Sequence, residues 1–121
     1  MSTRIAVASS DGKVINSHFG HAGQFLVFDL DDAGFQWKET RANEPACHTG
    51  EHDDRGLAAS ADRIKDCELV LVSRAGPVAV RLLASMGIRT LEVTDYIPTA
   101  LGKLVESRRK GMGRFRNRSE V

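Results

Sequence analysis

The sequence lacks the features that mark several large classes of protein. It holds two cysteines in 121 residues, too few to cross-link a domain of this size, and in a reducing compartment we expect them as thiols. No run of about 18 or more apolar residues is present to span a membrane. Met1–Ser10 has neither the basic start nor the apolar length of a secretory signal. We therefore expect a cytoplasmic protein with no membrane partner.

Motifs of nucleotide sites and of hydrolytic enzymes are also missing. Neither GxGxxG nor GxxxxGK occurs, which argues against a nucleotide site of either common type. Asp11 falls in the turn sequence SSDGK, and Asp53 and Asp54 stand where a helix needs N-terminal capping residues. These carboxylates therefore do not indicate a magnesium-dependent nuclease, and no residues specify a serine or cysteine triad. We expect a protein without catalytic activity.

The net charge of +1 conceals an uneven distribution. Residues 103–121 carry seven basic and two acidic side chains, which leaves ten basic and fourteen acidic ones for residues 1–102. From Gly111 onward the sequence has no apolar period, so a single domain of residues 1–110 is predicted to precede a flexible basic tail, 111–121. Charge alone supports docking of this tail on an acidic partner or on nucleic acid, and nucleic acid is not the partner we expect.

Hydrophobic patterning predicts an α/β domain. Strands are predicted where short apolar or alternating runs are bounded by turn residues: 4–9, 24–30, 35–41, 69–73 and 88–93. Helices are predicted at 53–66, 78–87 and 97–111. The turn sequence DDAG makes the second and third strands a hairpin, in which Phe35, Trp37 and Glu39 alternate with polar residues. Because helices between apolar strands imply parallel crossovers, we expect a mixed sheet of roughly five strands covered by helices.

The residues best suited to bind a metal gather in two predicted loops. The sequence SHFGH contains His18 and His21, and ACHTGEH contains Cys47, His48 and His52, which completes the set of four histidines. Imidazole and thiolate together suit zinc, copper or the iron of a cluster. If the two loops meet at one edge or end of the sheet, these imidazoles and the Cys47 thiol come together as candidate metal ligands.

A plain structural interpretation of these residues stays open. Phe19 can anchor the HFGH loop in the core while Gly20 supplies an unusual backbone angle, which would make the motif only a turn. Cys47 and His48 can likewise be an exposed pair. Cys67 lies just before the apolar run LVLV and is expected to be a buried small hydrophobe.

A second candidate site is the sequence SRAGP, residues 73–77, between a predicted strand and a predicted helix. In open α/β sheets ligands bind beyond the carboxyl ends of strands, and helix N-termini attract anions. Arg74 and the Gly76 amide are therefore candidates to hold a carboxylate, a phosphate or an anionic cluster. The alternative is that Gly76 and Pro77 only form the turn.

Three segments of the sequence resemble a known family when taken together and in order: RIAVASSDGKVINSHFGHAGQFLVFDL, CHTGEHDDR and DCELVLVSRAGP. The resemblance is to the dinitrogenase iron-molybdenum cofactor biosynthesis family, which includes NifX-like proteins and the C-terminal domain of NifB-like proteins, and it covers about Arg4 to Val105. It implies a ribonuclease-H-like, three-layer α/β fold with a mixed five-stranded sheet. It also implies binding of an iron–sulfur precursor of the nitrogenase cofactor, or of the finished cofactor.

The resemblance also suggests roles for individual residues. By position, His18 and His21 become the leading cluster-facing residues, and Cys47 and His48 lie in a loop that often carries Cys or His. Arg74 and Gly76 match the family's R-x-G-P turn, while His52 is a weaker match. The implied function is a non-enzymatic carrier of a metallocluster as transient cargo, with cofactor-assembly proteins as partners. The alternative is a non-catalytic regulatory or scaffolding module of the same fold that binds a protein or a small anion.

Overall fold

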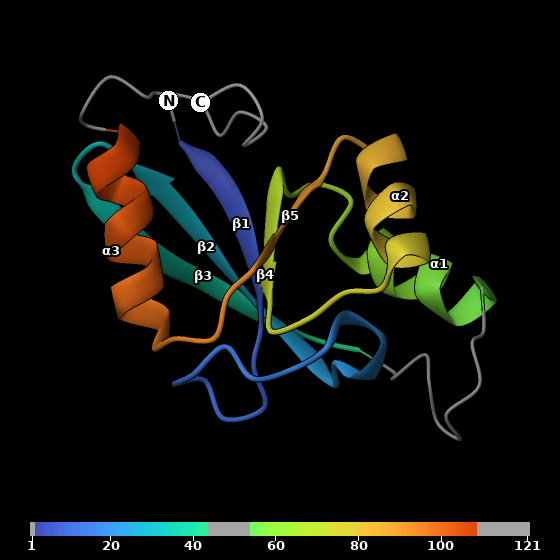
Figure 1. Ribbon diagram of the computed structural model, residues 1–121. Coiled ribbons are helices and arrows are strands. Elements are labelled where there is room, and N and C mark those ends of the chain that lie inside the picture. Colours follow the sequence, from blue (N-terminus) through green and yellow to red (C-terminus); the bar gives the residue numbers. More distant parts are fainter. Residues whose placement is uncertain (1, 44–53, 109–121) are drawn as a thin grey trace.

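The computed structural model describes residues 2–43 and 54–108 of the chain (Figure 1). Its strands are β1 (Thr3–Ala8), β2 (Gln24–Asp31), β3 (Gly34–Ala42), β4 (Leu69–Val72) and β5 (Arg89–Glu92). Its α-helices are α1 (Asp54–Arg63), α2 (Pro77–Ser85) and α3 (Ile97–Ser107), and a short 3-10 helix, η1, covers Phe19–His21. Within these residues no helix has the length and apolar character needed to cross a membrane.

Some predictions fall on residues outside the described part of the chain. Residues 44–53 contain Cys47, His48 and His52, and residues 109–121 contain the predicted basic tail, 111–121. The proposed roles of these residues therefore stay predictions.

The strands form one mixed sheet in the order β3-β2-β1-β4-β5. The pairs β1–β2 and β2–β3 are antiparallel, whereas β1–β4 and β4–β5 are parallel. Helices α1 and α2 lie over one face and α3 lies over the other, as Figure 1 shows. The predicted mixed five-stranded α/β architecture is confirmed, while its ribonuclease-H-like label stays a prediction.

The side chains of β1 divide between two cores because successive residues of a strand point to opposite faces. Ala6 and Ala8 face α1 and α2, whereas Ile5 and Val7 face α3. All four are fully buried. The small alanines leave room on the first face for large side chains from other segments, among them the fully buried Phe19 and Phe25. Phe19 lies in η1, so packing of this core also fixes the histidine loop.

Strand β3 departs from the predicted alternation. Val27 pairs with Glu39 and Phe28 pairs with Trp37, so Lys38 is an extra residue in a β-bulge. Cross-strand partners share a face, and Val27 and Phe28 belong to different cores, so Glu39 lies on the opposite face from Trp37. The prediction that Trp37 and Glu39 share a face was wrong because a bulge has no signal in the hydrophobic pattern. The bulge and its lysine also make this edge a poor template for another strand.

An ion-pair network ties the end of α1 to the sheet. Arg41 donates from Nη1 to Asp66 Oδ1 over 2.6 Å and to the Arg63 carbonyl over 2.7 Å, and its Nη2 lies 2.9 Å from Asp66 Oδ2. Arg4 donates to the same carboxylate over 3.0 Å and to Asp29 over 3.2 Å. The Arg41 guanidinium, with help from Arg4, holds the pKa of Asp66 well below its ordinary range.

This network predicts a pH-dependent stability. Replacing Asp66 by Asn should lower the free energy of unfolding by about 1 kcal/mol at neutral pH, since the pairs are partly exposed and screened by solvent. A carboxylate whose pKa is lowered in the folded state stabilises above its unfolded pKa of about 4, and this contribution fades as the pH falls further. Urea unfolding of wild type and Asp66→Asn at several pH values measures the difference. A difference that stayed constant down to strongly acidic pH would contradict the assignment.

Candidate functional site

The histidine loop is anchored by its own apolar residues. Phe19, between the two histidines, is fully buried, and its ring centroid lies 5.8 Å from that of Phe25. Ile15, at the start of the loop, is fully buried in the core beneath α3. The interpretation that Gly20 supplies an unusual backbone angle is wrong. Gly20 belongs to η1, and the positive φ angles among the described residues occur at Gly12, Gly34 and Gly87. The buried Phe19 ring and the 3-10 turn therefore shape this loop.

Backbone pairing brings the two candidate motifs together. His18 and Arg74 form a parallel bridge beyond the ends of β1 and β4. The Ser73 N–H donates to the Ser17 carbonyl over 3.0 Å, and the Phe19 N–H donates to the Arg74 carbonyl over 2.9 Å. Because β1 and β4 are parallel neighbours, both motifs lie at the carboxyl ends of strands, where open α/β sheets bind their ligands.

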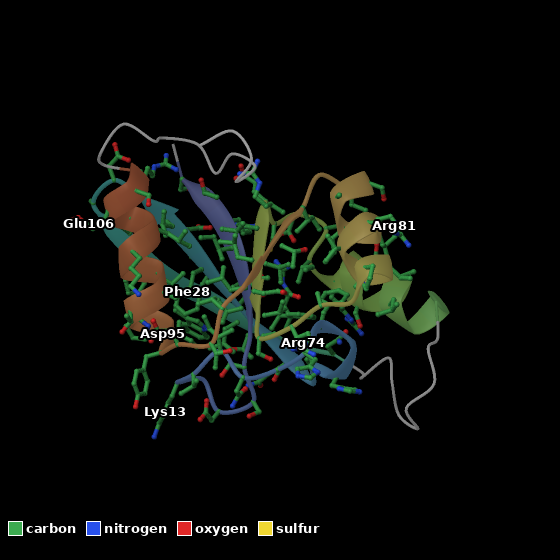
Figure 2. All side chains as sticks on the ribbon, in the orientation of Figure 1. Lys13, Phe28, Arg74, Arg81, Asp95 and Glu106 are labelled. Atoms are coloured by element: carbon green, nitrogen blue, oxygen red, sulfur yellow. The ribbon has the colours of Figure 1, made fainter. Side chains whose placement is uncertain are left out.

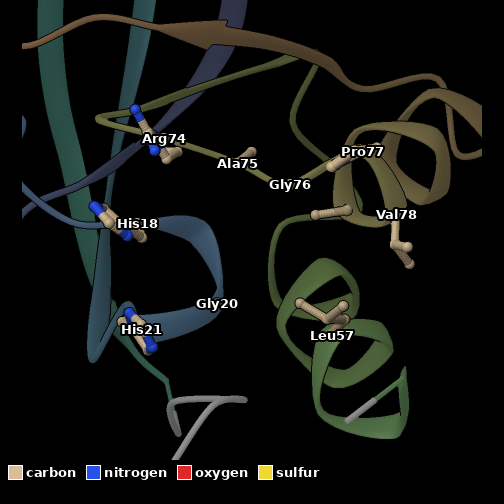
Figure 3. Close-up of a pocket in the computed structure, with 10 residues that line it drawn as sticks. His18, Gly20, His21, Leu57, Arg74, Ala75, Gly76, Pro77 and Val78 are labelled. Carbon is tan, nitrogen blue, oxygen red and sulfur yellow. The ribbon is translucent and has the colours of Figure 1, made fainter. Parts of the chain in front are cut away.

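A pocket of about 210 Å³ opens between these motifs and the helices over the same face. In the close-up of Figure 3, Arg74, His18 and His21 follow one side, while Pro77, Val78 and Leu57 lie on the other. We call these sides the polar wall (His18, His21, Arg74) and the helical wall (Leu57, Pro77, Val78, Ala79). Gly20, Ala75 and Gly76 complete the lining. The pocket therefore combines cationic or metal-binding groups with an apolar surface.

The two imidazoles lie side by side at the mouth of the pocket. Their ring centroids are 5.7 Å apart and the ring planes are inclined by 27°. The His21 N–H donates to the His18 carbonyl over 3.0 Å, so the 3-10 turn itself sets the spacing of the pair. Both side chains are exposed, and neither ring forms a hydrogen bond with the described residues. As far as residues 2–43 and 54–108 are concerned, both rings are therefore accessible to an incoming ligand.

The start of α2 adds positive potential to the pocket. Gly76 is the N-cap residue and supplies no side-chain cap, and Pro77 occupies the first turn. Residues 76–79 all line the pocket. Unpaired N–H groups and the helix dipole favour negative charge at such a terminus, and the Arg74 guanidinium lies just before it. This end of the pocket suits an anion.

Two residues that the sequence analysis did not single out hold the lining in place. The Glu92 carboxylate at the end of β5 accepts the Ala75 N–H over 2.8 Å, which fixes the SRAGP turn from the side opposite the histidine loop. The Asn43 side chain donates to the Ala22 carbonyl over 2.9 Å and to Ser60 Oγ over 3.0 Å. Neither residue has a periodic or motif signal, and their partners lie 17 to 21 residues away in the sequence.

Comparison with known proteins decides the family. The family model described as "Dinitrogenase iron-molybdenum cofactor" matches residues 1–107. This chain belongs to the dinitrogenase iron-molybdenum cofactor family. The family resemblance read from the sequence motifs is thereby confirmed, and the family is involved in biosynthesis of the iron-molybdenum cofactor.

Curated relatives agree with this membership, and a solved structure shares the fold. The FeMo cofactor biosynthesis protein NifB of Sinorhizobium fredii is 35% identical over 105 residues, which are 85% of this chain and 21% of that protein. The NifB protein of Azotobacter vinelandii is 39% identical over 75 residues, 60% of this chain and 15% of that protein. This chain thus spans about a fifth of the length of the curated relatives it matches. The crystal structure of PH0822 shares the fold, with a TM-score of 0.64 and 20% identity over 87% of this chain and 92% of that one.

Within residues 2–43 and 54–108 the ligand set is open rather than closed. The described residues contain no group of three or more His, Cys, Asp or Glu side chains placed to hold a metal ion. His18 and His21 alone therefore form an incomplete coordination sphere for a resident metal, because structural zinc sites need four protein ligands. Two accessible imidazoles do suit a cluster that brings its own sulfides and needs few protein ligands.

Cys67 is not part of the site. It is 4% exposed and packs in the core beneath α1 and α2, as predicted from its place before β4. Burial raises the pKa of its thiol to about 12, so the thiolate that metal binding or nucleophilic attack requires does not form at neutral pH.

Thiol reactivity tests this assignment. In a Cys47→Ser variant, Cys67 is the remaining cysteine. We expect the native variant to react with dithionitrobenzoate at pH 8 about 100-fold more slowly than the same protein in denaturant, because the thiol is both buried and protonated. Equal rates in the native and denatured protein would show that Cys67 is accessible.

Proposed function

We propose that this protein is a non-catalytic carrier that binds an iron–sulfur or iron-molybdenum cofactor precursor as transient cargo. The observation that carries the proposal is the joining of His18, His21 and Arg74 on one wall of a pocket at the carboxyl ends of β1 and β4. Family membership supplies the kind of cargo, since the family is involved in biosynthesis of the iron-molybdenum cofactor. Cofactor-assembly proteins would be its partners, and the cytoplasm its location.

The chemistry of the pocket suits such a cargo. Imidazole nitrogens can ligate the iron of a cluster, as they do where histidines replace cysteines at iron–sulfur centres. The guanidinium of Arg74 and the N-terminus of α2 would offset the negative charge of the cluster, and charge-assisted hydrogen bonds of this kind are about twice as strong as neutral ones. The apolar helical wall would limit contact of the bound cluster with water.

Few protein ligands would support a carrier rather than a permanent cluster protein, and the described residues offer two imidazoles. Coordination sites of the cluster that the protein does not occupy stay free for exchange, so a partner with cysteine ligands can remove it. On sequence grounds Cys47 and His48 would add ligands from residues 44–53. The second candidate function, a regulatory module that binds a small anion, is favoured by the open ligand set together with Arg74 and the α2 terminus.

Binding of a synthetic cluster tests the histidine ligands. Anaerobic titration with a thiolate-ligated [4Fe–4S] cluster, followed by absorbance, should show saturable binding to the wild-type protein. The double variant His18→Ala, His21→Ala should bind at least about tenfold more weakly, because loss of groups that hold or orient a metal typically costs 10- to 100-fold in affinity. Unchanged affinity in the double variant would remove the proposed ligands, and absence of binding by the wild type would favour the anion-binding module.

Two exposed arginines allow a matched test of the charge at the pocket. Figure 2 shows Arg74 near the histidine loop and Arg81 farther along α2, and Arg81 does not line the pocket. Arg74→Ala should weaken binding of the same anionic cluster by about tenfold and flatten its dependence on salt, whereas Arg81→Ala should change neither. The quantity measured is the dissociation constant at several salt concentrations. If the two substitutions weakened binding equally, Arg74 would act only through the net charge of the protein and not through its position at the pocket.

A further inference from the structure

Asn43 links segments that are distant in the sequence. Its backbone N–H donates to the Gly23 carbonyl over 3.0 Å, and its side-chain amide nitrogen donates to the Ala22 carbonyl and to Ser60 Oγ. These distances are 2.9 Å and 3.0 Å, within the usual range for such bonds. Both N–H bonds of one amide group are thus used at the same point, between the histidine loop and α1.

The two acceptors lie close in sequence to residues of opposite walls of the pocket. Ala22 is the C-cap residue of η1 and directly follows His21, so its carbonyl moves with the polar wall. Ser60 is fully buried in α1, one turn after Leu57, which lines the helical wall. The Asn43 amide is therefore a cross-link between the histidine loop and the helix that faces it.

Local backbone bonds do not provide the same cross-link. The η1 turn is closed by bonds between its own residues, and the loop is tied to the SRAGP turn through Ser17, Phe19 and Arg74. Those bonds fix the histidines relative to β4. The spacing between the histidines and α1 depends in addition on packing of Phe19 and Leu57 in the shared core, and on the Asn43 amide.

We propose that Asn43 is a positioning residue that sets the width of the pocket by joining its polar wall to α1. The inference rests on the proposed function for its consequence, cargo affinity, but the geometry itself concerns the free protein. Asn43 does not line the pocket. It acts through the backbone that carries His21 and through Ser60, so its loss shifts the imidazoles relative to the apolar surface opposite them.

The experiment compares three variants of the full chain with wild type: Asn43→Ala, Ser60→Ala and the double variant. Two quantities are measured for each, the ¹H–¹⁵N correlations of the His18 and His21 imidazoles in the free protein and the affinity for the [4Fe–4S] probe. Asn43→Ala should shift the signals of both rings and weaken binding by about tenfold. Ser60→Ala, which leaves the bond to Ala22 in place, should cause a smaller change in the same direction. If the amide acts as a link, the double variant should resemble Asn43→Ala alone.

Asp66→Asn is the control for a general loss of stability. Asp66 joins Arg4 and Arg41, none of which lines the pocket. The Asp66→Asn variant should have the imidazole spectrum and the probe affinity of the wild type, even though its unfolding midpoint is lowered. Unchanged ring signals in Asn43→Ala, or equal changes in Asp66→Asn, would overturn the proposal. If Asn43→Ala does not fold, unchanged ring signals in Ser60→Ala would overturn the proposal instead. Should the wild type bind no cluster, the proposed function fails, while the ring signals still decide the positioning role.

Discussion

The site depends on the parallel backbone pairing that continues beyond the ends of β1 and β4. After Ala8 the chain leaves the sheet, and it returns at Ser17 to pair with Ser73 and Arg74. Parallel pairing places both segments at the same end of the sheet, where the histidine loop and the SRAGP turn meet through main-chain hydrogen bonds. A ligand surface made this way is fixed by backbone hydrogen bonds, which leaves the side chains free for binding.

Burial of one aromatic ring keeps this pairing in register. Phe19 lies between the two histidines and is fully buried against Phe25, where the alanines of β1 leave room for it. Burying a side chain of this size contributes about 1.5 to 3 kcal/mol, several times the net value of a surface ion pair. Since His18 and His21 flank the ring, their exposure follows from its burial. The motif anchors the loop in the core and also leaves both histidines exposed, so the two interpretations of the sequence HFGH do not exclude each other.

Hydrophobic patterning was sufficient to predict the mixed sheet, its order of elements and the burial of Cys67. These features arise from the period of apolar residues along each element, and that information is local. The bulge at Lys38 could not be obtained this way because it depends on the register with β2. The ordinary backbone angle of Gly20 follows from the 3-10 turn, which the apolar period does not reveal. His18 and Arg74 were singled out separately from local motifs, and only the fold joins them. Asn43 and Glu92 were missed because a polar residue at a strand end resembles any loop residue until its partner is known.

The contrast between a rigid frame and exposed ligands explains how such a pocket would bind and release its cargo. The frame consists of backbone pairs, buried rings and amide links. The imidazoles and Arg74 are exposed, so a ligand can reach them without rearrangement of the chain. In the proposed carrier, affinity would come mainly from metal–nitrogen bonds and charge pairing at the surface, and a partner that approaches from solvent could replace both. Preorganised histidines would speed loading, their exposure would permit transfer, and both follow from their place at the carboxyl ends of two parallel strands.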